Sequence, residues 1–233
     1  VPGGRPIDAF CRERSLSVRD RLRLVLQACD ALEYAHKHLV IHRDLSPNNI
    51  LAYEDLSLPE GSDRLRVKLI DFGLAKPAGG TVLQQSGTTE RAGTPMGTLA
   101  YASPEQLRGD PGTDRRSDVY AMGAVLYQLL VDSPPISGDE LSREQSRERR
   151  LWMLTQSQPP SPSERLSRML GSGAKDHERA EAIVRARRTT LERFQRELRE
   201  DLNWLPMKAL EKARDERYQS AEAMAADIRN YLE

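Results

Sequence analysis

The sequence predicts a mainly α-helical domain with a few short β-strands. Residues 17–36 repeat apolar side chains at the spacing of an amphipathic helix, behind a serine that can cap its start. Residues 117–131 are apolar nearly all round, which is typical of a helix buried on every side. Short β-type runs lie between these helices, at 39–42, 49–53 and 65–70.

The composition describes a globular protein without a polyanionic partner. Of the 233 residues 38% are hydrophobic, which is enough for a core. Lysine plus arginine and aspartate plus glutamate each total 35, so no net charge favours nucleic acid or an anionic membrane. The longest apolar run, 120–131, is shorter than the roughly 20 residues that cross a bilayer. Cys11 and Cys29 lack metal-type spacing, so we expect free thiols in a cytoplasmic domain.

Polar connections separate the helices of the second half. Residues 75–102 are rich in Gly, Thr, Ser and Pro, and a connection of that length predicts a functional or mobile loop. A short helix is expected at 104–107. Residues 139–168 are charged and proline-rich, and we expect loops there around a short helix at 151–156.

Three helices are expected in the last third of the chain. Residues 175–202 form an amphipathic pattern with charges of mixed sign. The helix either packs on its own domain with a solvated outer face, which the mixed charges favour, or docks a partner. Two shorter helices, 204–212 and 221–232, close the chain. The chain opens at 1–6 on a turn segment without methionine, so we expect it to be cut from a longer protein.

One ordered motif points to chemistry. His42, Arg43, Asp44 and Leu45 are followed by Asn49, which resembles the H-R-D-L-x-x-x-N catalytic loop of protein kinases. These residues at fixed spacing arise by chance in such a chain with a probability on the order of one in ten thousand. Coincidence is therefore a weak alternative.

A second motif, Asp71, Phe72 and Gly73, follows a β-type run and resembles the D-F-G element of the same family. Phosphoryl transfer needs Mg²⁺ near the phosphates, and Mg²⁺ prefers oxygen ligands. Asp71 and Asn49 would supply a carboxylate and an amide oxygen. Asp44 would orient the acceptor hydroxyl and take its proton. Any single aspartate is more often a surface charge or a helix cap, but the ordered set favours chemistry.

The resemblance to protein kinases extends along essentially the whole chain, and its closing segment is similar to bacterial eukaryotic-like (Hanks-type) serine/threonine kinases. It implies that Thr98, which stands near the end of the activation segment, contacts Asp44. It implies that Asp118 braces the backbone of the catalytic loop. It also implies that Arg217 pairs with Glu105 of the Ser-Pro-Glu sequence.

The resemblance also implies a fold, cofactors and partners. The fold is the C-terminal lobe of the protein-kinase-like α+β fold, the cofactors are ATP and Mg²⁺, and the acceptor is a protein serine or threonine. Asn49, Leu51 and Asp71 would bind the nucleotide, while His42, Phe72 and Gly73 would support them. The domain 1–233 then divides into the catalytic loop to D-F-G at 39–73, the activation segment at 74–105, the central helix at 117–131, a charged insert and amphipathic helix at 139–200, and closing helices at 201–233.

Hydroxyl side chains in the activation segment are candidate regulatory sites. Thr88, Thr89 and Thr94 could be phosphorylated and then pair with Arg43, since a phosphate opposite an arginine can order a loop. Unmodified loop threonines are the alternative.

The chain departs from the kinase pattern in two places. Residues 1–41 contain neither the Gly-rich loop nor the strand lysine of a kinase, so we expect the N-terminal lobe to be absent from this chain and ATP binding by the chain alone to be poor. Ser46 also stands where serine/threonine kinases usually carry a lysine. Losing such a cation commonly costs about 2.7–4 kcal/mol of transition-state stabilisation.

Three hypotheses follow. In the first, the chain belongs to an ATP-dependent serine/threonine kinase whose missing lobe lies upstream or was omitted. In the second, it is a kinase-derived scaffold or pseudokinase fragment that binds proteins without turnover. In the third, it is an unrelated helical adaptor with chance motifs, which requires Asp44, Asn49 and Asp71 to lie apart.

Overall fold

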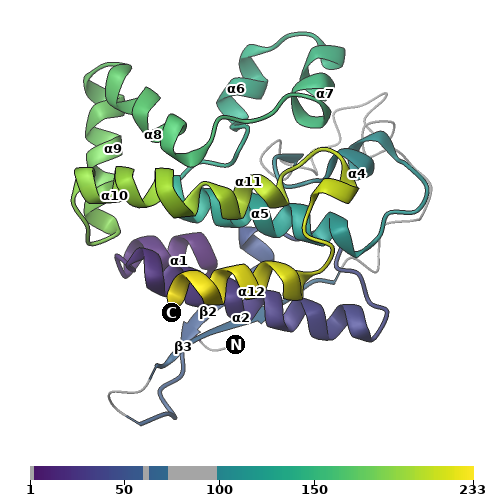
Figure 1. Cartoon of the computed structure of the whole chain (residues 1–233), viewed down its shortest axis with the longest axis horizontal. Coiled ribbons are helices and arrows are strands. Elements are labelled where there is room, and N and C mark those ends of the chain that lie inside the picture. The colour runs from purple at the N-terminus through teal and green to yellow at the C-terminus, as the bar shows by residue number, and fades with distance from the viewer. Residues whose placement is uncertain (1–2, 60–62, 73–98) are drawn as a thin grey trace.

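The computed structural model describes residues 3–59, 63–72 and 99–233, which fold around one central helix, α5 (Figure 1). The helices are α1 Ile7–Glu13, α2 Val18–Lys37, α4 Pro104–Arg108, α5 Arg115–Val131, α6 Gly138–Arg143, α7 Arg147–Thr155, α8 Pro162–Gly171, α9 Ala174–Ala186, α10 Leu191–Glu197, α11 Trp204–Ala209 and α12 Ala221–Leu232. The strands are β1 Arg5–Pro6, β2 Ile50–Glu54 and β3 Leu65–Leu69, and single helical turns cover Pro47–Asn49, Leu198–Leu202 and Arg214–Glu216. The prediction of a mainly α-helical domain with a few short strands is confirmed.

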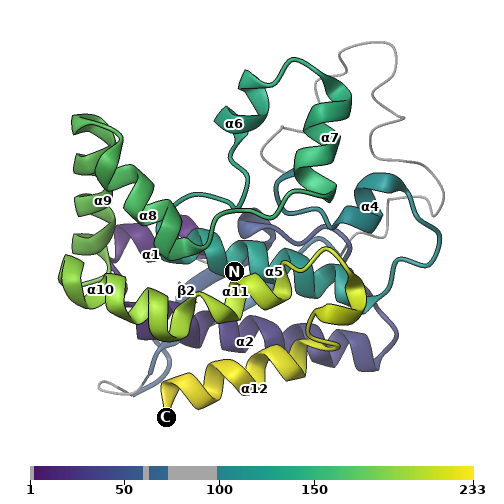
Figure 2. The ribbon, with the colours of Figure 1, turned by 45° about the horizontal axis from the view of Figure 1, so that its top comes forward.

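Helix α5 is buried on nearly every side, as its apolar sequence predicted. Helices α2, α8, α11 and α12 pack around it, and Figure 2 shows α11 lying along it. Asp114 caps its start by accepting the backbone N–H of Arg116 at 2.8 Å. The close approach of α11 requires glycine at position 123, because a Cβ there would lie 2.5 Å from the Cβ of Ala209.

Two buried arginines bind the last carbonyls of α5. Arg21 donates to the carbonyl of Leu129, and Arg187 donates to the carbonyls of Leu129 and Leu130. These carbonyls have no partner within the helix, and a cation there also interacts favourably with the helix dipole. Asp132 pairs with Arg187 at 3.0 Å and offsets one of the two charges. Burial and then the nearby Arg187 lower the pKa of Arg21 to about 10.

The three strands form one antiparallel sheet in the order β1-β2-β3. Ile50 pairs with Leu69, so the start of β2 meets the end of β3. One residue further out, the amide of Ile70 donates to the carbonyl of Asn49 at 3.0 Å. This register places the residues that precede β2 beside those that follow β3.

The predicted strand at 39–42 is wrong. The segment is a turn after α2, with a left-handed backbone at Leu39 (φ 61°). Leu39 is 93% exposed, and no described strand pairs with the segment. Its apolar residues fit a strand pattern, but a strand also needs a neighbour for its backbone groups.

Residues 139–168 contain more helix than the sequence predicted. Helices α6, α7 and α8 replace the expected loops around one short helix, and α7 packs against α4 on one side of the molecule (Figures 1 and 2). Ser137 and Ser161 each begin a helix with a capping box that is closed by the glutamate three residues later. The sequence therefore contains capping signals for these helices, but the prediction of loops gave more weight to the high content of charged residues and proline.

The single helix expected at 175–202 is broken into α9, α10 and a π-helical turn. The break follows from the left-handed backbone of Arg188 (φ 55°), after which Thr190 caps α10. The apolar side chains of this segment belong to the core of the domain: Ala180, Ile183, Val184, Phe194, Leu198 and Leu202. This face therefore packs on its own domain.

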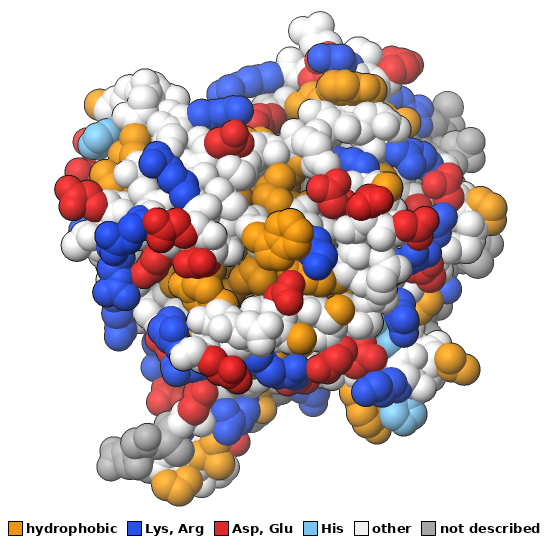
Figure 3. Space-filling model, viewed as in Figure 1, with side chains coloured by type: hydrophobic (Ala, Val, Ile, Leu, Met, Phe, Trp, Pro, Cys, Tyr) orange, Lys and Arg blue, Asp and Glu red, His pale blue; other side chains and the backbone are white. Residues whose placement is uncertain are grey.

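Positive and negative side chains are interspersed on the face shown in Figure 3. Hydrophobic side chains gather near the middle of that face, over α11, whose Trp204 is 59% exposed and lies near the ammonium group of Lys208. Within the described ranges, no helix combines the length and apolar character needed to cross a membrane.

Both cysteines are buried as free thiols, and we predict that they do not react in the native protein. Burial raises the pKa of Cys11 to about 11 and raises that of Cys29 further, so little thiolate forms near pH 8. A chromogenic disulfide reagent should label neither thiol in native buffer and both in guanidinium chloride. Rapid labelling of the folded protein would contradict this packing.

Candidate active site

The catalytic-loop motif lies between α2 and β2, and His42 ties it to the end of β3. The His42 side chain is buried, and its Nε2 lies 2.9 Å from the carbonyl oxygen of Ile70. Its ring also packs against Phe72, with ring centroids 4.6 Å apart. Because Asp71 lies between these two contacts, His42 holds that segment against the loop.

Asn49 provides a second link across the same region. Its side-chain nitrogen donates to the carbonyl of Asp44 at 2.7 Å, and its own carbonyl accepts from Ile70. The amide nitrogen therefore faces the loop, which leaves the amide oxygen for another donor or a cation. Together with the His42 contacts, these bonds bring positions 44, 49 and 71 to one end of the small sheet. An unrelated adaptor with chance motifs would instead place these three residues apart.

Asp118, in the first turn of α5, holds the backbone of the loop. Its carboxylate accepts the amides of His42 and Arg43, each at 2.8 Å, and lies 2.8 Å from Nε2 of His36. Arg43 has a left-handed backbone (φ 64°), which costs a non-glycine residue about 1–2 kcal/mol. The buried carboxylate compensates by satisfying two amides at this bend.

Glu105 and Arg217 form a buried ion pair between α4 and the segment before α12. Two guanidinium nitrogens contact the two carboxylate oxygens at 2.7 and 2.9 Å, and the Ser117 hydroxyl donates at 2.7 Å. Burial alone would raise the pKa of Glu105, but the hydrogen bonds and charge of Arg217 and the Ser117 hydroxyl outweigh it and lower the pKa. The pair fixes α4 against the start of α5.

Two contributors to the site were not expected from the sequence. His36 supports Asp118, and Gln106 donates its side-chain amide to the carbonyl of Arg43 at 2.7 Å. Ser103 and Gln106 form a capping box, so the S-x-x-Q spacing was a local sign that Gln106 is fixed. No local pattern could identify His36, because its partner is 82 residues away in the chain.

The remaining predicted residues are placed as follows. Ser46 is buried just before the turn Pro47–Asn49, and Leu51 lies in β2. The Nε atom of Arg43 is buried and has no hydrogen-bond partner among the described residues. The predicted positions Gly73, Thr88, Thr89, Thr94 and Thr98 lie outside the described residues.

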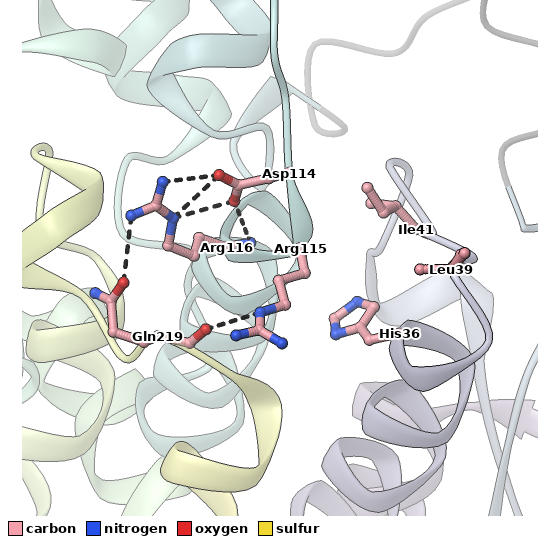
Figure 4. A pocket seen from close by; sticks show the side chains of 7 residues that line it. All are labelled: His36, Leu39, Ile41, Asp114, Arg115, Arg116 and Gln219. Atoms are coloured by element: carbon pink, nitrogen blue, oxygen red, sulfur yellow. Dashed lines mark hydrogen bonds and ion pairs between the residues drawn. The ribbon is translucent and has the colours of Figure 1, made fainter.

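A pocket of about 420 Å³ lies between the end of α2 and the start of α5 (Figure 4). The residues that line it are His36, Leu39, Ile41, Asp114, Arg115, Arg116 and Gln219. Arg116 is paired with Asp114 at 2.8 Å, and the Arg115 side chain donates to the carbonyl of Gln219 at 3.0 Å. Since Asp44, Asn49 and Asp71 do not line it, this pocket is separate from the catalytic-loop site.

The donor set fits Mg²⁺ that is bound together with a nucleotide. Asp71 offers an exposed carboxylate and Asn49 an amide oxygen, which are hard ligands of the kind Mg²⁺ prefers. Across the ranges that the structure describes, no cluster of three or more His, Cys, Asp or Glu could hold a metal ion by itself. Mg²⁺ commonly has only one or two carboxylate ligands from the protein where substrate phosphates and waters complete the coordination.

Comparison with known proteins identifies the family. A family model of the protein kinase domain matches residues 1–227. The chain is 32% identical over 213 residues to serine/threonine-protein kinase PknB of Mycolicibacterium smegmatis, covering 91% of this chain and 26% of that protein. It is 37% identical over 147 residues to serine/threonine-protein kinase A of Synechocystis, covering 60% of this chain and 26% of that protein. The chain belongs to the protein kinase family, and the two relatives named here are bacterial serine/threonine-protein kinases.

Solved structures agree on the fold. The kinase domain of Mycobacterium tuberculosis PknI superposes with a TM-score of 0.56 at 21% identity, covering 99% of this chain and 63% of that one. The chain spans about a quarter of the length of the curated relatives named above. The match reaches from the first residue to residue 227, and the prediction that only the C-terminal lobe is present stays a prediction.

Removing the cation of the buried pair should destabilise the fold. We predict that Arg217→Ala lowers the free energy of unfolding near pH 7 by roughly 3–5 kcal/mol, because Glu105 remains buried without its partner. Folding lowers the pKa of Glu105, so its stabilising contribution is complete above the unfolded pKa of about 4.3 and is lost as the pH falls through the folded value. The difference between the two proteins should therefore shrink in acid.

Urea unfolding measures this difference, and Arg214→Ala is the matched control. Arg214 begins the short helical turn that precedes Arg217, but its side chain is 31% exposed. It donates to the carbonyl of Gly112 and lies 3.9 Å from a carboxylate oxygen of Asp114. We expect the control to lose less than about 1 kcal/mol. Equal losses in the two variants would contradict the role given to the buried pair.

Proposed function

We propose that this chain carries the catalytic loop of an ATP-dependent serine/threonine protein kinase, which transfers a phosphoryl group to hydroxyls of a protein substrate. The single observation that carries the proposal is the hydrogen-bonded network that joins Asp44, Asn49 and the end of β3 at Ile70. Membership of the kinase family supports the same reaction class.

Asp44 is the proposed base of the reaction. Asp44 follows the bend at Arg43, and the Asn49 side chain donates to the Asp44 carbonyl, so the backbone of Asp44 is held in place. From this position the Asp44 carboxylate would orient the acceptor hydroxyl and take the hydroxyl proton. Asn49 and Asp71 are the proposed ligands of Mg²⁺. When bound, Mg-ATP supplies the phosphoryl group and the cation that neutralises charge on its oxygens.

Other predicted residues have supporting roles in this proposal. Leu51 would contribute an apolar contact to the nucleotide, and Thr98 would contact Asp44. Arg43, whose Nε lacks a described partner, pairs with a phosphate on Thr88, Thr89 or Thr94. We place the domain in the cytoplasm and propose that a Gly-rich loop and a strand lysine outside residues 1–233 complete the ATP site.

A pseudokinase or scaffold is the second candidate, and Ser46 favours it. A lysine at this position would place a cation near the transferred phosphate, whereas the serine is neutral and buried. The scaffold candidate predicts a kinase fold that binds protein partners and transfers no phosphate.

Asp44→Asn tests the leading candidate. We predict that the protein that carries residues 1–233 phosphorylates myelin basic protein with Mg-ATP, and that this change lowers kcat about 100-fold or more by removing the base. Asp176→Asn, an exposed position in α9, is the matched control and should keep wild-type activity. Equal residual activity in the wild-type protein and Asp44→Asn would favour the scaffold.

Ser46→Lys asks whether the missing cation limits the rate. If the site transfers phosphate, we predict that this change raises kcat at least about tenfold, because one group that steadies transition-state charge is commonly worth several hundredfold. Thermal unfolding of the same variant checks that the buried position accepts a lysine. A stable variant with an unchanged rate would show that serine costs nothing at this site.

A further inference from the structure

Gln106 in α4 is bonded at both ends of its side-chain amide. Its nitrogen donates to the carbonyl of Arg43 at 2.7 Å. Its oxygen accepts the backbone amide and the hydroxyl of Ser103, each at 3.0 Å. The Ser103 amide can only donate and the Arg43 carbonyl can only accept, so one orientation of the Gln106 amide satisfies both partners.

The carbonyl that Gln106 holds belongs to the left-handed residue of the catalytic loop. Asp118 accepts the amide of Arg43, and Gln106 donates to its carbonyl, so α5 and α4 hold the same residue from its two backbone groups. Asp44 is the next residue. A backbone bend that costs free energy persists only where its surroundings enforce it, and these two side chains provide that enforcement.

The helix that carries Gln106 is itself firmly anchored. Its neighbour Glu105 is buried and paired with Arg217, and Pro104 begins the helix with the fixed φ of its ring. The Gln106 side chain therefore connects a well-anchored helix to the bend in the catalytic loop.

We propose that Gln106 is a positioning residue of the kinase reaction: it holds the Arg43 carbonyl so that Asp44 points at the acceptor hydroxyl. This role rests on the function proposed above. It also couples two parts of the site, because α4, at the end of the activation segment, is hydrogen-bonded to the backbone that leads into Asp44.

Gln106→Glu separates this role from helix capping. A carboxylate at position 106 can still accept from Ser103, as glutamate does in a capping box, but it cannot donate to the Arg43 carbonyl. Ser103→Ala is the complementary control, because it removes the capping hydroxyl and leaves Gln106 able to donate to Arg43.

The first measurement is steady-state phosphorylation of myelin basic protein by the protein that carries residues 1–233. We expect Gln106→Glu to lower kcat about 10- to 100-fold, as small displacements of a catalytic group do, with KM for ATP within about twofold. Because a protonated carboxyl can donate, the deficit relative to wild type should shrink as the pH falls from about 8 to about 5.5. Ser103→Ala should stay within about threefold of wild type at each pH.

The second measurement needs no activity: hydrogen exchange of the backbone amides of His42 and Arg43, which Asp118 binds. Gln106→Glu should speed their exchange about tenfold, while Ser103→Ala should affect only α4. If the wild-type protein transfers no phosphate, the proposed function fails and the exchange rates alone decide the structural role. Wild-type exchange in Gln106→Glu, or loss of kcat equal to that of Ser103→Ala, would overturn the proposal.

Discussion

The carboxylate of Asp118 is the contact on which the candidate site depends. It is buried at the start of the central helix and accepts two consecutive amides of the catalytic loop, while His36 contacts one of its oxygens. A buried carboxylate is tolerated only when its hydrogen bonds are satisfied. Here the three groups that contact it come from the end of α2 and from the catalytic loop, both far from Asp118 in the sequence. The loop is therefore positioned by the core of the domain.

Side chains of opposite charge bind unpaired backbone groups at the two ends of α5. An acidic residue near its start takes up amides of the loop, and Arg21 and Arg187 near its end take up unpaired carbonyls. Both choices agree with the direction of the helix dipole. Helices α2, α11 and α12 pack on α5. The buried polar contacts at its two ends therefore hold the catalytic loop and the end of α2 in fixed positions relative to the core.

The sequence allowed prediction of the features that local pattern determines. The helices α2, α5 and α12, the strands β2 and β3 and the free cysteines follow from periodicity, capping residues and cysteine spacing. The apolar run at 39–42 was misread, because whether such a run forms a strand depends on a partner elsewhere in the chain. The helix expected at 175–202 is interrupted at Arg188, where a single left-handed residue ends it. His36 and Gln106 were missed because their roles exist only once distant segments meet.

In the proposed function, Asp44, Asn49 and Asp71 surround one metal-bound triphosphate. A crystal structure of the protein that carries residues 1–233, with Mg²⁺ and a non-hydrolysable ATP analogue, tests this arrangement. We expect Mg²⁺ at about 2.0–2.1 Å from oxygens of Asn49 and Asp71, with the terminal phosphate facing Asp44. A nucleotide bound elsewhere, or a metal ion that contacts neither side chain, would contradict it.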